Sequence, residues 1–495
     1  MIRIVLLVVV YSIIFLALSI VAYNTWLQYR GVNLPYSSPI ETGGETPDFI
    51  IVVLLDGASS PVVQSYIRSA ETSVLLDMGL FLPNGRSVYP SYSGPSRASI
   101  LTGVPPAVHG VVSNEGAFKV KITGLIDLAR EKGFKIINIG DGLIETIFGV
   151  KAVAIDEGAG QGSLALKKAV EVLRANLSNG SKVFIWVTVN DVDVIGHKAG
   201  GFSKEYNATV KNYLILIAGF ISEISDVLNR GVVVVLSDHG FKKGGHHGGG
   251  EDTVMNTFMF IAGRGIAPGV CYEEFLLIDI APSLGILTSI GVPPYSMGKA
   301  LATCLGINPT PAEMKRKEVY NLLGTRETVS MFTDQLWIRL FIITALFIPL
   351  VLEVRRIGLK PLTLGVAFLV IYIVYYVYSV RVYTFSDIYS FTEVMTKIIV
   401  AVVVVSFLTG LFAARFYPTR GEVARGLIGA YLFIITVVFI GVSTFLVPYG
   451  PVVVFPNPDW DFAVRYFAML ITGSFSGLVG MPIALVTAIL IQKNR

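Results

Sequence analysis

All five histidines of the 495-residue chain lie between His109 and His247, and four of them lie near aspartates at spacings typical of metal ligands. The candidate ligands fall into three short segments: Asp193-Val-Ile-Gly-His197, Ser237-Asp238-His239-Gly240 and Gly245-His246-His247-Gly248. Neutral imidazole and carboxylate together favour borderline cations such as Zn²⁺. The sequence therefore predicts a metalloenzyme.

Strand-like runs explain how these side chains would meet. Short apolar, β-branched runs occupy residues 50–55, 135–139, 183–189 and 232–236, and helical patterns occupy residues 164–177 and 203–228. This alternation predicts an α/β domain with a doubly wound sheet of buried parallel strands. Ligands of such sheets bind at the carboxyl ends of the strands. Asp56, Asp193 and Asp238 each follow a predicted strand, so we expect them to lie close together.

The number of candidate ligands predicts two ions. Asp193 and His197 face the same way if a helical turn follows the strand. A buried carboxylate at Asp56 is costly unless it is paired or binds a metal. Five or six nitrogen and oxygen ligands exceed the four of one tetrahedral zinc, so we expect two metals about 4 Å apart. Spacing alone does not choose between His246 and His247 as the last ligand.

A serine-rich segment supplies a candidate nucleophile, Ser93, within Pro90-Ser-Tyr-Ser93-Gly-Pro-Ser-Arg97-Ala-Ser-Ile-Leu-Thr102-Gly103. With this segment, the chain from Ile50 to about Leu301 resembles the alkaline phosphatase superfamily. The type I phosphodiesterase/nucleotide pyrophosphatase branch places its nucleophilic Thr or Ser where Ser93 lies. Its metal motifs match Asp193-x-x-Gly-His197 and Asp238-His239-Gly240, and its order of motifs is kept through Pro106-Ala-Val-His109-Gly110 and Asp279-Ile-Ala-Pro282.

The resemblance implies a division of the ligands between two divalent ions, most simply Zn²⁺, with Mn²⁺ or Ca²⁺ as alternatives. One ion would be held by Asp56, Asp238, His239 and the Ser93 oxygen. The other would be held by Asp193, His197 and His247, which leaves His109 with a structural role. Ser93 would attack phosphorus to form a covalent phospho-enzyme, which water or an acceptor alcohol would resolve.

Ser96 and Arg97 are expected to contact the nonbridging oxygens of the substrate, Arg97 as a bidentate donor. The alternative for Arg97 is a surface ion pair. The run Ser93-x-Pro-Ser-Arg97 also resembles the sulfatase signature, in which Cys or Ser becomes formylglycine. Sulfatases usually carry paired aspartates after the first strand and bind calcium through oxygen. Here Gly57 follows Asp56, and imidazole ligands have no role in a calcium site, which favours phosphoester chemistry. A third hypothesis, an inactive membrane scaffold, conflicts with the complete ligand set.

Composition indicates a membrane protein. The chain is 53% hydrophobic and 15% charged, with a mean hydropathy of +0.66, whereas soluble domains carry roughly 25% charged residues. The net charge is +4, but the basic residues mostly flank apolar segments. We therefore expect membrane lipid and a phosphoester substrate as partners, and no nucleic acid.

The predicted domains are a transmembrane anchor (1–25), a linker (26–47), a catalytic domain (48–325) and a transmembrane domain of five helices (332–495). The distribution of Lys and Arg predicts six spans with both termini in the cytoplasm and the catalytic domain outside. This layout is similar to that of the ethanolamine-phosphate transferases of glycolipid anchors, which suggests a lipid-linked substrate. Cys271 and Cys304 form either a disulfide or two buried thiols.

Overall fold

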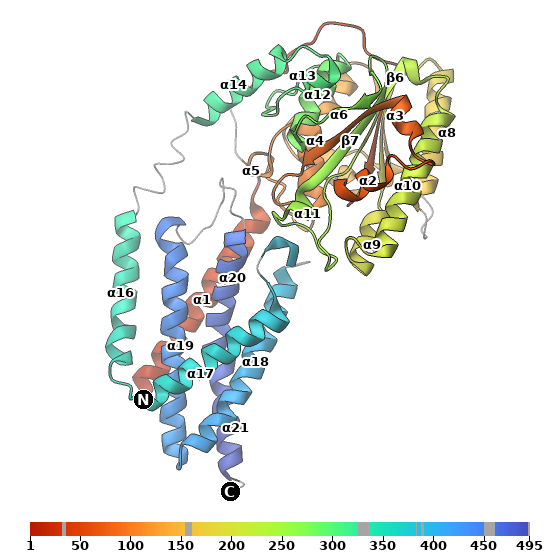
Figure 1. The fold of residues 1–495 in the computed structure, drawn as a ribbon. Coiled ribbons are helices and arrows are strands. Elements are labelled where there is room, and N and C mark those ends of the chain that lie inside the picture. Colours follow the sequence, from red (N-terminus) through yellow and green to blue (C-terminus); the bar gives the residue numbers. More distant parts are fainter. Residues whose placement is uncertain are drawn as a thin grey trace. The chain divides into compact units, whose positions relative to one another are not determined.

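The computed structural model describes residues 1–31, 36–153, 161–324, 336–382, 384–387, 391–449 and 461–493. The chain divides into two compact units. One contains the described residues of Tyr29–Arg326, and the other contains Met1–Gln28 with the described residues that follow position 335 (Figure 1). Residues 32–35 of the expected linker, and the expected domain boundaries at 325 and 332, lie outside the described residues.

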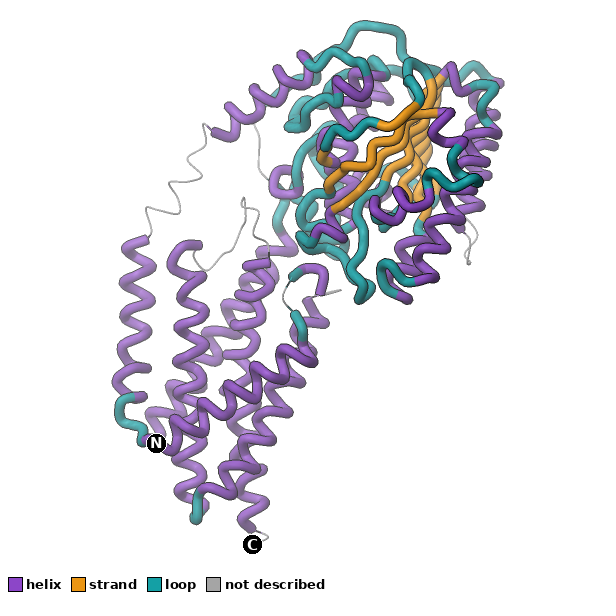
Figure 2. The backbone as a smooth tube through the Cα atoms, viewed as in Figure 1, coloured by secondary structure: helices purple, strands orange, loops and turns teal. Residues whose placement is uncertain are grey.

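A nine-stranded mixed sheet forms the centre of the first unit (Figure 2). Its strand order is β4-β3-β5-β1-β6-β7-β2-β8, with β9 paired to β2. Strands β4, β3, β5, β1 and β6 are parallel neighbours, whereas β7 is antiparallel to both β6 and β2. The strands are β1 (Phe49–Leu55), β2 (Gly79–Arg86), β3 (Lys135–Ile139), β4 (Ala152–Val153), β5 (Val183–Val189), β6 (Gly231–Leu236), β7 (Asn256–Gly263), β8 (Gly269–Val270) and β9 (Phe275–Leu276).

Helices cover both faces of the sheet, because alternate residues of its buried strands enter two different cores. From β1, Ile51 and Val53 join one core with residues of α2, α8 and α10, whereas Ile50 and Val52 join the other with residues of α4, α6, α7 and α12. The α-helices of this unit are α2 (Ser60–Tyr66), α3 (Val74–Met78), α4 (Ser93–Thr102), α5 (Pro106–His109), α6 (Leu125–Glu131), α7 (Gly142–Phe148), α8 (Gln161–Ser178), α9 (Asp191–Ala199), α10 (Lys204–Glu223), α11 (Asp252–Met255), α12 (Ile280–Leu287), α13 (Ala302–Leu305) and α14 (Thr310–Gly324). The predicted doubly wound α/β fold is confirmed.

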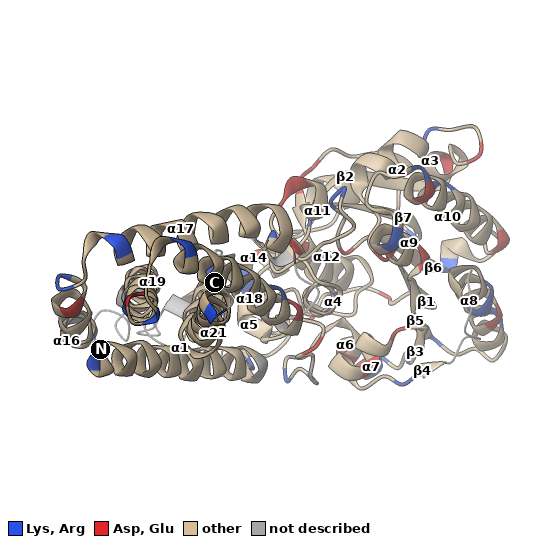
Figure 3. Ribbon diagram, turned by 90° about the horizontal axis from the view of Figure 1, so that it is seen from below, with Lys and Arg blue, Asp and Glu red and all other residues tan. Residues whose placement is uncertain are grey.

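The second unit is helical. Its α-helices are α1 (Ile2–Gln28), α16 (Leu336–Val354), α17 (Leu359–Tyr375), α18 (Phe391–Phe416), α19 (Arg420–Tyr449), α20 (Asp461–Phe475) and α21 (Met481–Lys493). Helix α19 packs against α1, α16, α17 and α20, and α18 packs against α21. The helices carry few charged residues along their length (Figure 3). The predicted all-α bundle is therefore confirmed for the described residues.

Among the residues that the structure describes, five helical segments are long and apolar enough to cross a membrane: Ile2–Trp26, Leu359–Val380, Thr392–Phe416, Arg420–Leu446 and Val464–Lys493. They correspond to the predicted anchor and to four of the five predicted carboxy-terminal spans. The remaining one, predicted from residue 336 onward, is the 19-residue helix α16, which contains Pro349 and is not among the five. The chain thus has the helices of a polytopic membrane protein.

Candidate metal centre

The three aspartates lie at the carboxyl ends of three adjacent parallel strands. Asp56 directly follows β1, Asp193 lies in the first turn of α9 after β5, and Asp238 lies two residues beyond β6. Strand β1 is in register with both neighbours, and the Asp56 amide donates to the Val189 carbonyl at 3.0 Å. This register brings the three strand ends together, as the sequence predicts.

A first cluster surrounds the Ser93 hydroxyl. His239 Nε2 lies 3.3 Å from Ser93 Oγ, 3.4 Å from Asp56 Oδ1 and 3.7 Å from Asp238 Oδ2. The two carboxylates and the imidazole of this cluster are at most 5% exposed. The four residues that the resemblance assigns to one ion therefore lie together, in a nearly closed site.

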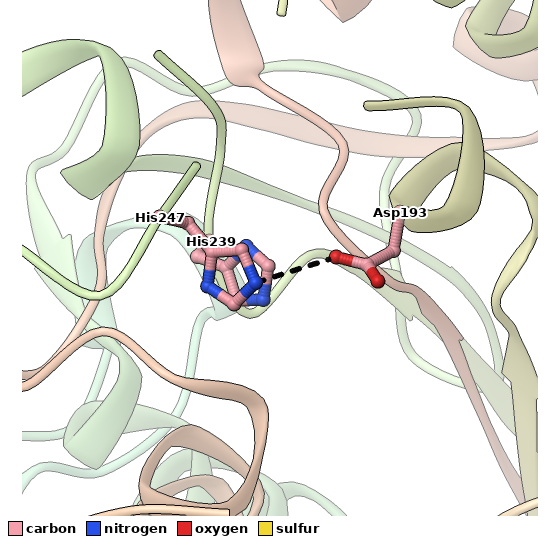
Figure 4. Close-up of side chains that lie close together, drawn as sticks. All are labelled: Asp193, His239 and His247. Carbon is pink, nitrogen blue, oxygen red and sulfur yellow. Dashed lines mark ion pairs between the residues drawn. The ribbon is translucent and has the colours of Figure 1, made fainter. Parts of the chain in front are cut away.

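A second cluster lies beside the first. His197 Nε2 is 3.1 Å from His247 Nε2 and 3.6 Å from Asp193 Oδ2, and His247 Nε2 is 3.6 Å from Asp193 Oδ1. Figure 4 shows the Asp193 carboxylate directed at the stacked rings of His239 and His247, whose centroids are 3.7 Å apart. Ligand atoms of Asp193, His239 and His247 lie within 4.8 Å of one another, so the two clusters adjoin. The side chains of Asp193 and His197 are 20% and 30% exposed, which leaves this side more open to water.

The second nitrogen of each imidazole faces a backbone carbonyl. His197 Nδ1 lies 2.9 Å from the Gly245 oxygen, His239 Nδ1 lies 3.2 Å from the Gly240 oxygen, and His247 Nδ1 lies 3.2 Å from the Ser91 oxygen. A carbonyl accepts only from a protonated nitrogen, so these contacts favour the tautomer with hydrogen on Nδ1. Each Nε2 then carries a lone pair directed into the clusters.

Three buried carboxylate oxygens of the two clusters are suited to binding cations. Asp56 Oδ1, Asp193 Oδ1 and Asp238 Oδ2 are buried and have no hydrogen-bond partner among the described residues. The other oxygens of Asp56 and Asp238 are engaged, by Arg97 and by the amides of Gly57 and His239. Three carboxylate oxygens and three Nε2 lone pairs facing one another repel unless positive charge lies between them. This donor set suits zinc-like ions.

The pKa shifts of the clustered aspartates and histidines also indicate that positive charge would stabilise the site. Burial, reinforced by the charge of Asp238, raises the pKa of Asp56 to about 7, and burial raises the pKa of both Asp193 and Asp238. Burial lowers the pKa of His239 to about 4 and holds the pKa of His247 well below its ordinary value. Neutral imidazoles beside carboxylates that are costly to ionise are a combination that bound cations stabilise.

Ser93 is the first residue of α4 and is 6% exposed. The first amides of a helix have no intrahelical acceptor and carry partial positive charge, which favours anions there. One of these amides, that of Gly94, donates to Asn114 Oδ1 at 2.7 Å. The Asn114 side chain therefore lies beside the backbone amide that follows Ser93. Sequence reasoning missed Asn114, because it follows no strand and belongs to no motif used above.

Arg97 lies in the interior of the domain. Its guanidinium is 4% exposed, with NH2 against Asp56 Oδ2 and Nε 3.0 Å from Asp141 Oδ2. This arrangement differs from the surface ion pair considered above, and it engages the guanidinium with protein carboxylates. Ser96 is fully buried, with its hydroxyl 3.3 Å from that of Ser87. Asp141 was also missed, although it follows β3 just as the other aspartates follow their strands.

The two remaining histidines are His109 and His246. His109 Nε2 lies 2.9 Å from Ser99 Oγ, and His109 Nδ1 accepts from the Val111 amide at 3.1 Å. These contacts are those of a structural residue. Among the described residues, the groups of three ligand atoms within 4.8 Å of one another include His247 but neither His246 nor His197. His197 joins the second cluster through its 3.1 Å contact with His247.

Solved structures with a similar fold come from several enzyme groups. A protein of the alkaline phosphatase superfamily from Vibrio parahaemolyticus is 15% identical, with a TM-score of 0.41 over 59% of this chain and 75% of that one. The lipoteichoic acid synthase LtaP from Listeria monocytogenes is 13% identical (TM-score 0.40; 55% and 78% covered). An inactive form of murine ectonucleotide pyrophosphatase/phosphodiesterase 5 in complex with AMP is 10% identical (TM-score 0.41; 54% and 96% covered).

The model of the type I phosphodiesterase/nucleotide pyrophosphatase family matches residues 50–120. This segment runs from β1, with Asp56 at its end, through the Ser93 helix to Asn114. The match confirms the resemblance to this family over residues 50–120, and the motifs around Asp193, Asp238 and His247 lie beyond the matched segment.

Proposed function

We propose that this chain is a membrane-anchored, two-metal phosphodiesterase or phosphotransferase that acts outside the membrane through Ser93. Its membership among phosphodiesterase/pyrophosphatase-like proteins rests on the family match. The observation that carries the finer proposal is the pair of adjoining Asp/His clusters, one of which contains the Ser93 hydroxyl.

Two divalent cations fit the donor set, and Zn²⁺ fits it best because half of the unpartnered donors are imidazole nitrogens. Asp56, Asp238, His239 and Ser93 would hold one ion. The second would be held by Asp193, His197 and His247. When bound, such ions supply Lewis-acid charge that lowers the pKa of an attacking hydroxyl and stabilises charge on a leaving oxygen.

The chain's own groups position the reaction. Ser93 Oγ forms a bond to phosphorus, the bond to the leaving alcohol breaks, and the Ser93 proton passes to solvent. We expect the partial positive charge at the amino terminus of α4 to stabilise the negative oxygens of the phosphoryl group. Arg97 holds Asp56 in place through its ion pair rather than contacting substrate. Water or an acceptor alcohol then attacks phosphorus and releases Ser93.

Two observations support an exoplasmic location. Cys271 and Cys304 form a disulfide, and such bonds persist mainly in oxidising compartments. A 19-residue helix such as α16 is about 28 Å long, close to the thickness of a bilayer core. With α16 counted as a span, six spans place both termini on the same side, and the distribution of Lys and Arg favours the cytoplasm for that side. A catalytic domain held at the membrane surface suits a lipid-linked phosphoester.

The test uses the purified full-length protein in detergent with a chromogenic phosphodiester. We expect two bound Zn²⁺ per chain, loss of turnover on chelation, and recovery on adding Zn²⁺. Ser93→Ala should lower turnover by on the order of 10³-fold or more while the ions stay bound. Turnover that survives this substitution would remove Ser93 as the nucleophile. Calcium together with an aldehyde mass on the Ser93 peptide would instead establish the sulfatase alternative.

A further inference from the structure

Phe241 lies where the two clusters meet. It follows His239 by two residues, in the loop after β6, and is fully buried. Its ring centroid is 5.0 Å from that of His197, 5.2 Å from that of His247 and 5.8 Å from that of His239. The corresponding interplanar angles are 88°, 74° and 68°, so all three contacts are edge-to-face. One apolar ring therefore contacts all three imidazoles of the proposed centre.

Glycines leave the space that this ring fills. A Cβ at Gly57 or at Gly196 would lie 2.6 Å from Phe241 Cε2, and a Cβ at Gly201 would lie 2.6 Å from Phe241 Cβ. Gly57 follows Asp56 in the chain, and Gly196 precedes His197. The ring therefore packs directly against backbone that carries a ligand of each cluster, with no side chain between them.

The far side of the ring is also fixed. Tyr206 contacts it at 5.9 Å between centroids and is fully buried. The Tyr206 hydroxyl donates to the Gly57 carbonyl at 2.6 Å and accepts from the Ser59 amide at 2.8 Å. The turn after β1 and the loop after β6 thus hold one aromatic pair between them, so the ring has little freedom to move away from the imidazoles.

We propose that Phe241 is a positioning residue of the metal centre, whose ring sets the spacing and rotation of His197, His239 and His247. The carbonyl contacts of Nδ1 fix one end of each imidazole, and the edge of Phe241 fixes the plane in which each ring lies. Together they keep the three Nε2 atoms directed at the ions. This inference rests on the proposed function, because it assigns to Phe241 the geometry of that site.

The experiment measures metal binding by the full-length protein after the metal is removed. Phe241→Leu keeps an apolar side chain but removes the ring edge. We expect its affinity for Co²⁺ and Zn²⁺ to fall about tenfold or more, with a changed visible spectrum of the Co²⁺ form. Phe258→Leu is the matched control, because Phe258 is 1% exposed, belongs to the same core and packs against Phe81. It should lower thermal stability to a similar extent and leave the Co²⁺ spectrum unchanged.

A second variant tests the position of the Phe241 ring without changing Phe241 itself. Gly196→Ala should push Phe241 aside and weaken Co²⁺ binding, whereas adding it to Phe241→Leu should have little further effect. If Phe241→Leu fails to fold, Gly196→Ala decides the matter. Normal Co²⁺ affinity and spectrum in the folded variants would reduce Phe241 to core packing. A wild-type chain that binds neither ion would instead overturn the proposed function itself.

Discussion

Five side chains of the proposed metal centre each engage one end with the protein and leave the other end facing the clusters. Asp56 gives Oδ2 to Arg97 and leaves Oδ1 without a partner among the described residues, and Asp238 gives Oδ1 to two backbone amides and leaves Oδ2. The imidazoles do the same, with Nδ1 on a carbonyl and Nε2 inward. Because the engaged ends fix the orientation of the remaining ones, the donor set is arranged before any ion arrives.

Substitution of Arg97 can distinguish a structural role of this residue from a role in substrate binding. Its partners Asp56 and Asp141 are both nearly fully buried, so Arg97→Met should lower the free energy of unfolding by about 3–5 kcal/mol, since it leaves buried charges unpaired. The matched control is Arg174→Met, whose exposed pair with Asp226 should cost about 1 kcal/mol or less. Chemical denaturation of the metal-free protein measures both. An Arg97→Met protein that is fully stable but inactive would support direct contact with substrate instead.

At the scale of elements, α4 begins with Ser93, the proposed nucleophile, and packs against α5. His109, at the end of α5, contacts Ser99 of α4, and α4 also packs against α7 and α12. His109 therefore lies where α4 and α5 meet, outside both Asp/His clusters.

His109 predicts a measurable pH dependence. Burial lowers its folded-state pKa from 6.5 to about 3, so below pH 6.5 the unfolded chain binds a proton that the folded chain excludes. Proton binding by the unfolded chain therefore lowers the free energy of unfolding as pH decreases from 6.5 toward 3, by up to about 1.4 kcal/mol per pH unit. His109→Gln should reduce the slope of unfolding free energy against pH between 6 and 4. An identical slope in the two proteins would contradict the assignment.

Prediction from the sequence succeeded for some strands and failed for others. The four strands predicted from β-branched runs became β1, β3, β5 and β6, because buried parallel strands need continuous apolar surface. Strand β2 was missed: its sequence, Gly-Leu-Phe-Leu-Pro-Asn-Gly-Arg, contains residues typical of turns, and its pairing with β7 shifts register between Leu82 and Gly85. The site was predicted where ligands follow strands or share a helical turn, as Asp193 and His197 do on α9. Asn114 and Phe241 act through contacts between distant loops, which no local pattern records.

At the scale of the whole molecule, the chain combines a sheet domain with a helical unit that contains five segments able to cross a membrane. The number of membrane spans decides on which side of the membrane each terminus lies, because five spans place the two termini on opposite sides and six place them on the same side. Helix α16 is therefore the element on which the proposed topology depends. The disulfide between Cys271 and Cys304 leaves no free cysteine among the described residues, so introduced thiols can report sidedness without background from either.

Two matched glycine positions test this topology. Gly219 on α10 and Gly358 before α17 both have open space where a Cβ would lie, so Gly219→Cys and Gly358→Cys should leave the fold unchanged. In intact cells, a membrane-impermeant maleimide should label the first variant, because the proposed topology places α10 on the exoplasmic side. The second should be labelled only after permeabilisation, since α16 would carry residue 358 to the cytoplasmic side. Labelling of both in intact cells would mean that α16 does not cross, and labelling of neither would place the catalytic domain inside.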